Sequence, residues 1–155
     1  MGRRVRLLAG IAPWFRASAL FAALATTAPV ADAGQSPLAL GKVTTRRDSK
    51  SLESAFKTAV QRELAGIDLA AVKPADRYVL SASLVKMETS ADGDRARTTC
   101  VVSATLTKQR GGALHAIISG RARVEDAPAQ TRSAELTAMR AAVHNALVRV
   151  PEALR

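Results

Sequence analysis

Two histidines, one cysteine and a few scattered carboxylates are the side chains of this chain that could perform chemistry. His115 and His144 are the two histidines, and Cys100 is the single cysteine among 155 residues. Nucleophilic catalysis needs a nucleophile, a base and an orienting group that converge, and no G-x-S-x-G elbow is present. We expect His115, on the outward face of a strand, and His144, off the apolar stripe of a helix, to be solvated and without a catalytic role.

The sequence also lacks the patterns that bind metals or cofactors. A zinc site uses three or four closely grouped ligands, and Cys100 lies far from both histidines in the sequence. Asp92 and Asp94 flank a glycine, which is typical of a tight turn rather than of paired catalytic carboxylates or a calcium loop. Neither G-x-G-x-x-G nor a Walker pattern occurs. We therefore predict no metal, no cofactor and no enzymatic activity.

The single cysteine excludes an internal disulfide. Cys100 alternates with Val102 and Ala104 on the apolar side of an expected strand. We therefore expect it to be a buried, inert thiol. The alternative is a disulfide to a partner, because an unpaired cysteine in an oxidising compartment can bond to another chain.

The first 33 residues have the three parts of a secretory signal peptide. A basic leader is followed by an apolar run over 17–28, and Ala31 and Ala33 occupy the two positions that a signal peptidase reads. The apolar run is shorter than the roughly 20 residues of a membrane span. We predict cleavage before Gly34, a periplasmic or secreted product and no stable membrane span afterwards. The alternatives are an uncleaved anchor and a cytosolic helix.

The mature chain would be strongly basic. The whole chain has a net charge of +10, and residues 1–33 hold four arginines and one aspartate, which leaves +7 on residues 34–155. A basic domain in an envelope meets anionic lipid head groups and cell-wall polymers. The alternative is an ordinary domain with an arginine-rich composition. Phe56 and Tyr78 are the only aromatic residues after position 33, so specific nucleic-acid recognition is not expected.

Hydrophobic periodicity predicts the order β-α-β-β-β-α in one domain over 38–150. A flexible start at 34–37 precedes a short strand at 38–44. One-sided apolar stripes predict helices over 49–64 and 131–150, with Pro151 ending the second helix before a tail at 151–155. Alternating residues predict strands over 77–88, 98–108 and 114–124, joined by turns at Asp92-Gly93 and Gly111-Gly112.

The economical packing is an α+β two-layer sandwich with both helices on one face of a mostly antiparallel sheet. Leu114 falls among the inward positions, and Met87 and His115 fall among the outward ones. The open face would then mix hydroxyls, arginines and aliphatic residues. We predict that it binds a partner through Arg121, Arg123, Arg97, Ser119 and Ser103, with the hairpin at 92–97 at its rim. An ordinary half-solvated sheet has the same composition, so that interpretation stays open.

Two stretches carry a family resemblance. Residues 75–83 are similar to an A-D-Y-V-L-x-G start of the second strand, with Arg77 inserted and Ala82 where glycine is common. Ser119-Gly120-Arg121-Ala122 is similar to the strand after a T-G turn. With the element order, they resemble small bacterial envelope domains: the penicillin-binding-protein activator lipoproteins, the curli-secretion lipoproteins and the N-terminal domain of the Tol-Pal beta-propeller protein. This chain departs from them in its short first strand and in lacking the anchoring cysteine.

The resemblance implies a non-enzymatic adaptor that docks on envelope machinery. The sequence therefore favours an exported basic domain that binds an envelope protein or an anionic cell-wall component. One alternative is a small-molecule binder or small enzyme with a pocket near Cys100 or His115. The other is a homo-oligomer that pairs through the first strand or an exposed edge.

Overall fold

The computed structural model describes residues 36–46, 49–70, 72 and 77–155. The expected cleavage site at Ala31, Ala33 and Gly34 lies outside these residues. The elements follow the predicted order and are β1 (Leu38–Thr45), α1 (Lys50–Ala65), β2 (Tyr78–Asp92), β3 (Arg95–Lys108), β4 (Leu114–Asp126), a 3-10 turn (Pro128–Gln130), α2 (Thr131–Leu147) and α3 (Val150–Ala153).

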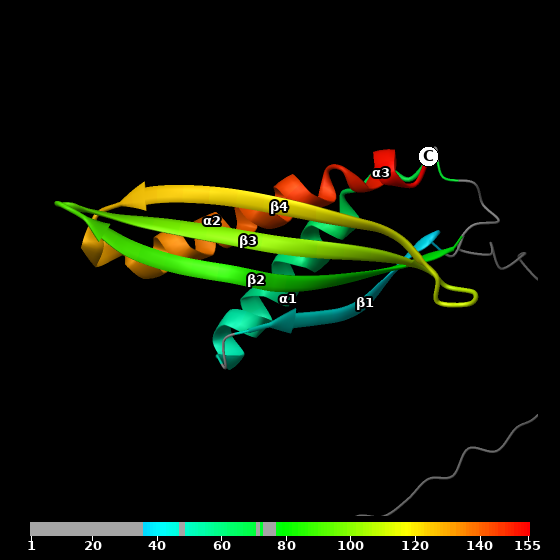
Figure 1. Ribbon diagram of the computed structural model, residues 1–155, viewed down its shortest axis with the longest axis horizontal. Coiled ribbons are helices and arrows are strands. Elements are labelled where there is room, and N and C mark those ends of the chain that lie inside the picture. The colour runs from blue at the N-terminus through cyan, green and yellow to red at the C-terminus, as the bar shows by residue number, and fades with distance from the viewer. Residues whose placement is uncertain (1–35, 47–48, 71, 73–76) are drawn as a thin grey trace, which may run out of the picture. The chain divides into compact units, whose positions relative to one another are not determined.

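The four strands form one open sheet in the order β1-β2-β3-β4. β1 runs parallel to β2, and the other two pairs are antiparallel. Helices α1 and α2 lie on one face of the sheet and leave the other face open (Figure 1). The predicted α+β two-layer sandwich is thus confirmed. Its core is filled by large apolar side chains from both layers, including Phe56, Val60, Leu80, Leu106, Met139 and Leu147.

Local signals set the bounds of the helices. The Ser49 hydroxyl accepts a hydrogen bond from the backbone N–H of Leu52 at 3.4 Å, which satisfies one free donor at the start of α1. The helix predicted over 131–150 ends earlier, at Leu147. Pro151 does not end it but lies in the first turn of α3, where its missing N–H has no partner to lose. Leu154 then packs into the core, with 6% of its surface exposed.

A bulge in β2 changes which side chains face the helices. Leu84 pairs with Val102 but Lys86 pairs with Val101, so Val85 is an extra residue without a partner on β3. One extra residue reverses the alternation beyond it. Met87 is therefore buried, and its predicted place on the open face is wrong. Thr89 also turns inward, and its hydroxyl shares a 2.9 Å hydrogen bond with the buried Thr98.

A second bulge lies at the start of β4. Leu106 pairs with Ala116 and Thr107 pairs with Leu114, which leaves His115 as the extra residue. Leu114 consequently faces out and is 60% exposed, contrary to the prediction. His115 faces the helix side instead of the open face. Its Nε2 lies 2.8 Å from the carbonyl oxygen of Ala153, and its ring centroid lies 4.8 Å from that of Tyr78.

The two layers approach each other closely where α2 packs on β4. Gly120 faces α2, and a Cβ built on it would lie 2.6 Å from the backbone nitrogen of Ala146 and would also strike the carbonyl oxygen of Ala142. The side of α2 that is buried has alanines at every fourth position, and none is more than 1% exposed: Ala134, Ala138, Ala142 and Ala146. Small residues on both elements permit this close approach.

Gly120→Ala is expected to lower the free energy of unfolding by about 3 kcal/mol, because the added methyl group would meet helix backbone that cannot move aside. Urea denaturation measures the effect. Gly66→Ala is the matched control, since the nearest atom to its Cβ would be 3.6 Å away, and we expect a change within about 1 kcal/mol. Equal effects of the two substitutions would contradict this account of the packing.

Candidate functional site

The open face is organised in rows that cross the strands. At its middle, Ser83 pairs with Ser103, which pairs with Ser119. Thr44 of β1 extends the row, and its hydroxyl donates a 3.3 Å hydrogen bond to the Ser83 hydroxyl. This hydroxyl row separates two unlike ends of the face.

One end, toward the β2–β3 hairpin, is charged. Its rows are Lys86–Val101–Arg121, Glu88–Thr99–Arg123 and Ser90–Arg97–Glu125. Ion pairs form within it: Lys86 Nζ lies 2.8 Å from Glu88 Oε2, and Arg97 Nε lies 2.8 Å from Glu125 Oε1. We call these three rows the basic end, since cations outnumber carboxylates in them by four to two.

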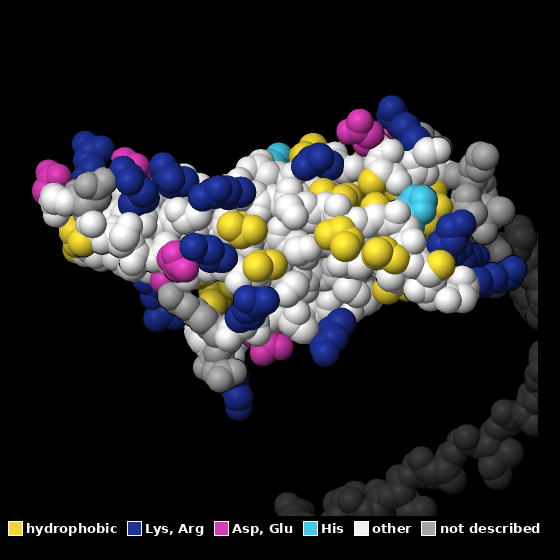
Figure 2. Space-filling model, viewed as in Figure 1, with side chains coloured by type: hydrophobic (Ala, Val, Ile, Leu, Met, Phe, Trp, Pro, Cys, Tyr) yellow, Lys and Arg dark blue, Asp and Glu magenta, His cyan; other side chains and the backbone are white. Residues whose placement is uncertain are grey.

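Arg121 and Arg123 are the cations of the basic end that remain without a carboxylate partner in the described part of the chain. They lie two residues apart on β4, so both side chains leave the same face, and both residues are exposed. The backbone carbonyl of Arg121 accepts a 2.9 Å hydrogen bond from the Asn145 side chain of α2, which holds this part of β4 in place. Dark blue side chains follow this edge of the sheet in Figure 2.

All five residues predicted for partner binding lie on the open face, but they do not form one cluster. Arg121 and Arg123 are exposed, whereas Arg97 is held by Glu125. Ser103 and Ser119 face each other in the hydroxyl row and are therefore next to the basic end. The hairpin at 92–97 lies at the rim of this end, with Gly93 in a left-handed conformation at φ 64°.

The other end of the open face is apolar. Its rows are Val79–Thr107–Leu114 and Ser81–Thr105–Ile117. Leu114 and Ile117 are 60% and 62% exposed, and Figure 2 shows hydrophobic side chains gathered over this half of the face. We call these two rows the apolar end. Sequence analysis missed Leu114 because the bulge at His115 has no signature in the residue types.

The side chains with reactive chemistry do not converge. Cys100 is fully buried, and burial raises the pKa of its thiol to about 12. It lies on the inward face as predicted, out of reach of a disulfide partner. His144 Nδ1 lies 2.9 Å from Glu63 Oε2 and links α2 to α1, a contact that sequence analysis missed. Among the described residues, no three His, Cys, Asp or Glu side chains are grouped to hold a metal.

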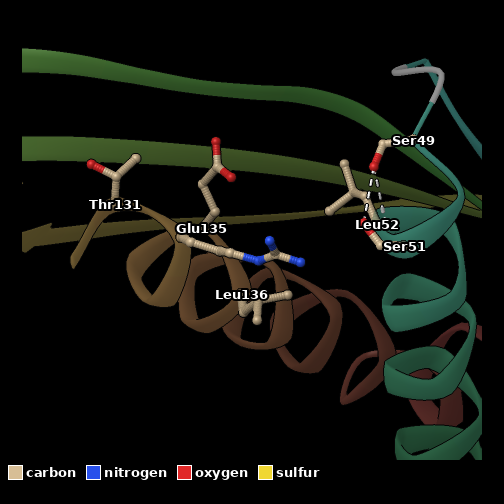
Figure 3. A pocket seen from close by; sticks show the side chains of 7 residues that line it. Ser49, Ser51, Leu52, Thr131, Glu135 and Leu136 are labelled. Carbon is tan, nitrogen blue, oxygen red and sulfur yellow. Dashed lines mark hydrogen bonds between the residues drawn. The ribbon is translucent and has the colours of Figure 1, made fainter. Parts of the chain in front are cut away.

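Clefts lie between α1 and α2 in the described part of the chain. One of about 390 Å³ opens between the starts of α1 and α2 and is shown in Figure 3; its lining includes Ser49, Leu52 and Glu135. Another of about 370 Å³ lies near the ends of the same helices and includes Glu63 and His144. Neither cleft is lined by Cys100 or His115, where the small-molecule alternative expects a pocket.

Within the described ranges, we find no helix with the length and apolar character that crossing a membrane requires.

No protein-family model and no curated protein matches this chain. Several solved bacterial structures have a similar fold. A PelC variant from Paraburkholderia phytofirmans, solved as a dodecamer, has a TM-score of 0.51 and 16% identity over 76% of this chain and 86% of its own. A hypothetical protein from Chlamydia trachomatis has a TM-score of 0.51 and 13% identity over 76% and 96%.

A third structure, a protein from Xanthomonas campestris, has a TM-score of 0.51 and 13% identity over 74% of this chain and 80% of its own. At these identities the likeness is one of fold. It agrees with a small bacterial α/β domain, and it does not identify the chain with any of the three families that the sequence resembles.

Cys100 is expected to make the unfolding free energy fall at alkaline pH. The thiol of the unfolded chain loses its proton above about pH 9, whereas the buried thiol keeps its proton up to about pH 12. Between these values the unfolded state binds fewer protons, so stability falls by up to about 1.4 kcal/mol per pH unit. Urea denaturation from pH 8 to 11 should show a steeper loss for the native protein than for Cys100→Ala. Parallel curves would show that the thiol titrates normally.

Proposed function

We propose that this protein is an exported, non-catalytic domain of the bacterial envelope that binds a protein with an acidic surface through the basic end of its open sheet face. The observation that carries the proposal is the pair Arg121 and Arg123. These two exposed arginines lie two residues apart on a face that no described helix covers, and neither has a carboxylate partner among the residues that the structure describes.

The pair suits a carboxylate-bearing surface. Each guanidinium presents a planar set of donors that matches a carboxylate with two parallel hydrogen bonds. Val101 and Thr99 are the partners of the two arginines on β3. Both are half-buried, so a partner protein could contact their short side chains beside the arginines. Since β4 is held against α2 by the Asn145 side chain, the arginines project from a rigid support, which reduces the entropy lost on binding.

The surrounding sequence strengthens the charge. Between Asp94 and Glu125 the chain has six basic residues and no acidic one, but Lys108 and Arg110 lie at the other end of the sheet face. The excess of positive charge that remains at the basic end attracts acidic partners over distances of about 10 Å at moderate salt. It also disfavours pairing of two copies through this end, because like charges would meet.

Export rests on the leader. The basic start, the apolar run and the Ala31–Ala33 pair predict removal of residues 1–33 and release on the far side of the inner membrane. The absence of a catalytic role rests on the separate positions of Cys100, His115 and His144 in the fold.

Export is tested by the N-terminus of the protein in the cells that make it. We expect the exported form to begin at Gly34, and intact-mass measurement of the periplasmic fraction or medium checks this. Ala33→Arg should block cleavage, because the peptidase accepts small residues there. A mass that corresponds to the chain with residues 1–33 still present would contradict the predicted cleavage. Recovery of the protein only from the cytosol would contradict export.

The binding site is tested by Arg121→Glu/Arg123→Glu. Crosslinking in cells followed by affinity purification should recover an envelope protein with the native chain and about tenfold less of it with the variant. Arg140→Glu/Arg149→Glu changes the net charge equally from exposed positions on the helix side and is the matched control.

Equal recovery with both variants would remove the basic end as the site. Recovery of the chain alone would instead favour the self-associating alternative, and the dodecameric PelC variant gives that alternative a precedent among proteins of this fold.

A further inference from the structure

We infer that the β3–β4 turn and the apolar end of the open face dock on an anionic lipid surface. Leu114 and Ile117 would enter the boundary of the acyl chains, while Lys108 and Arg110 would lie at the phosphates. The site is at the opposite end of the face from Arg121 and Arg123, so it stands or falls separately from the function proposed above.

The turn between β3 and β4 is exposed along its whole length. It is closed by a 2.8 Å hydrogen bond from the Lys108 N–H to the Ala113 carbonyl oxygen, and it extends past the end of the sheet (Figure 1). Gly111 and Gly112 have φ values of 81° and 63°, and a Cβ added to either would have no atom within 4 Å. Since residues 108–114 are all exposed, the turn can contact a flat surface.

Large aliphatic side chains are exposed next to this turn. Leu114 and Ile117 lie on the same face, because their partners Thr107 and Thr105 are two residues apart on β3. Each has about three-fifths of its surface in water. Transfer of such side chains into the lipid boundary removes apolar area from water, and this drives the binding of peripheral proteins to membranes.

The charges around the turn complement anionic head groups. Lys108 ends β3 and Arg110 lies in the turn, and Arg77 is joined to them by a 2.8 Å hydrogen bond from the Gln109 N–H to its carbonyl oxygen. Neither β3, the turn nor the adjacent half of β4 has an acidic residue. On the helix side, Glu152 and Arg155 are charged residues of opposite sign.

A lipid surface fits these observations better than a second copy of the chain. Two copies packed through this end would bring their Lys108 and Arg110 side chains together, and these like charges would repel each other. Anionic phosphates would instead attract the same side chains. The aliphatic side chains also lie exposed on the sheet face beside the hairpin turn.

Vesicle sedimentation tests the proposal with the purified exported protein. We expect binding to vesicles of phosphatidylcholine with added phosphatidylglycerol, and little binding to phosphatidylcholine alone. Leu114→Ser/Ile117→Thr should weaken binding by about tenfold or more. Lys108→Gln/Arg110→Gln should weaken it by about fivefold for each charge removed. Val148→Ser is the matched control, because Val148 is also 60% exposed but lies at the end of α2 on the other side of the domain. This substitution should leave vesicle binding unchanged.

A labelled turn provides a second measurement that does not depend on the stability of those variants. Cys100 is fully buried, so a fluorophore sensitive to polarity would attach only to an introduced cysteine. The label on Ala113→Cys should shift to shorter wavelengths with anionic vesicles, and the label on Val148→Cys should not. Equal shifts at both sites, or none at Ala113, would overturn the proposal.

Two other results would also overturn it. Binding that is unaffected by Leu114→Ser/Ile117→Thr would show that the apolar end does not touch lipid. A fall in the molecular mass of the lipid-free protein on the same substitutions would show that a second copy covers this end.

Discussion

The close packing of α2 on β4 is the contact on which the rest of the structure depends. Gly120 on the strand and the alanines on the helix bring backbone against backbone, so the helix layer lies flat on β4 and β3. Helix α1 lies beside it over β1, so both helices pack on the inward face of the sheet. The opposite face is then left uncovered, and both binding sites that we propose lie on it.

The element order and the layer arrangement could be predicted because they depend on hydrophobic periodicity, which is visible in the residue types themselves. Leu80, Leu84, Val102 and Leu106 recur at every second position of their strands, and Phe56 and Val60 fall on one side of a helix. The basic part of the open face could also be predicted, since Arg121 and Arg123 lie on the polar side of β4 in any register that buries Ile118.

The bulges could not be predicted, and they decide the remaining details. At Val85 and His115 one strand has an extra residue, and neither residue type demands it. A single insertion reverses the alternation beyond it. Met87 was therefore assigned to the wrong face by periodicity alone, as were Leu114 and His115. Contacts between distant elements, such as His144 with Glu63 and His115 with Ala153, likewise need the assembled fold.

The hydroxyl row at the middle of the open face has a thermodynamic consequence. Ile117 and Arg121 are separated by four residues on an extended strand, or about 13 Å. Ser83, Ser103 and Ser119 lie in one row between the two ends, and they pair with one another across the strands. Side chains that far apart, without a shared partner, contribute independently, so free-energy changes from substitutions at the two ends should add. One sheet face can therefore be altered at one end without changing the properties of the other.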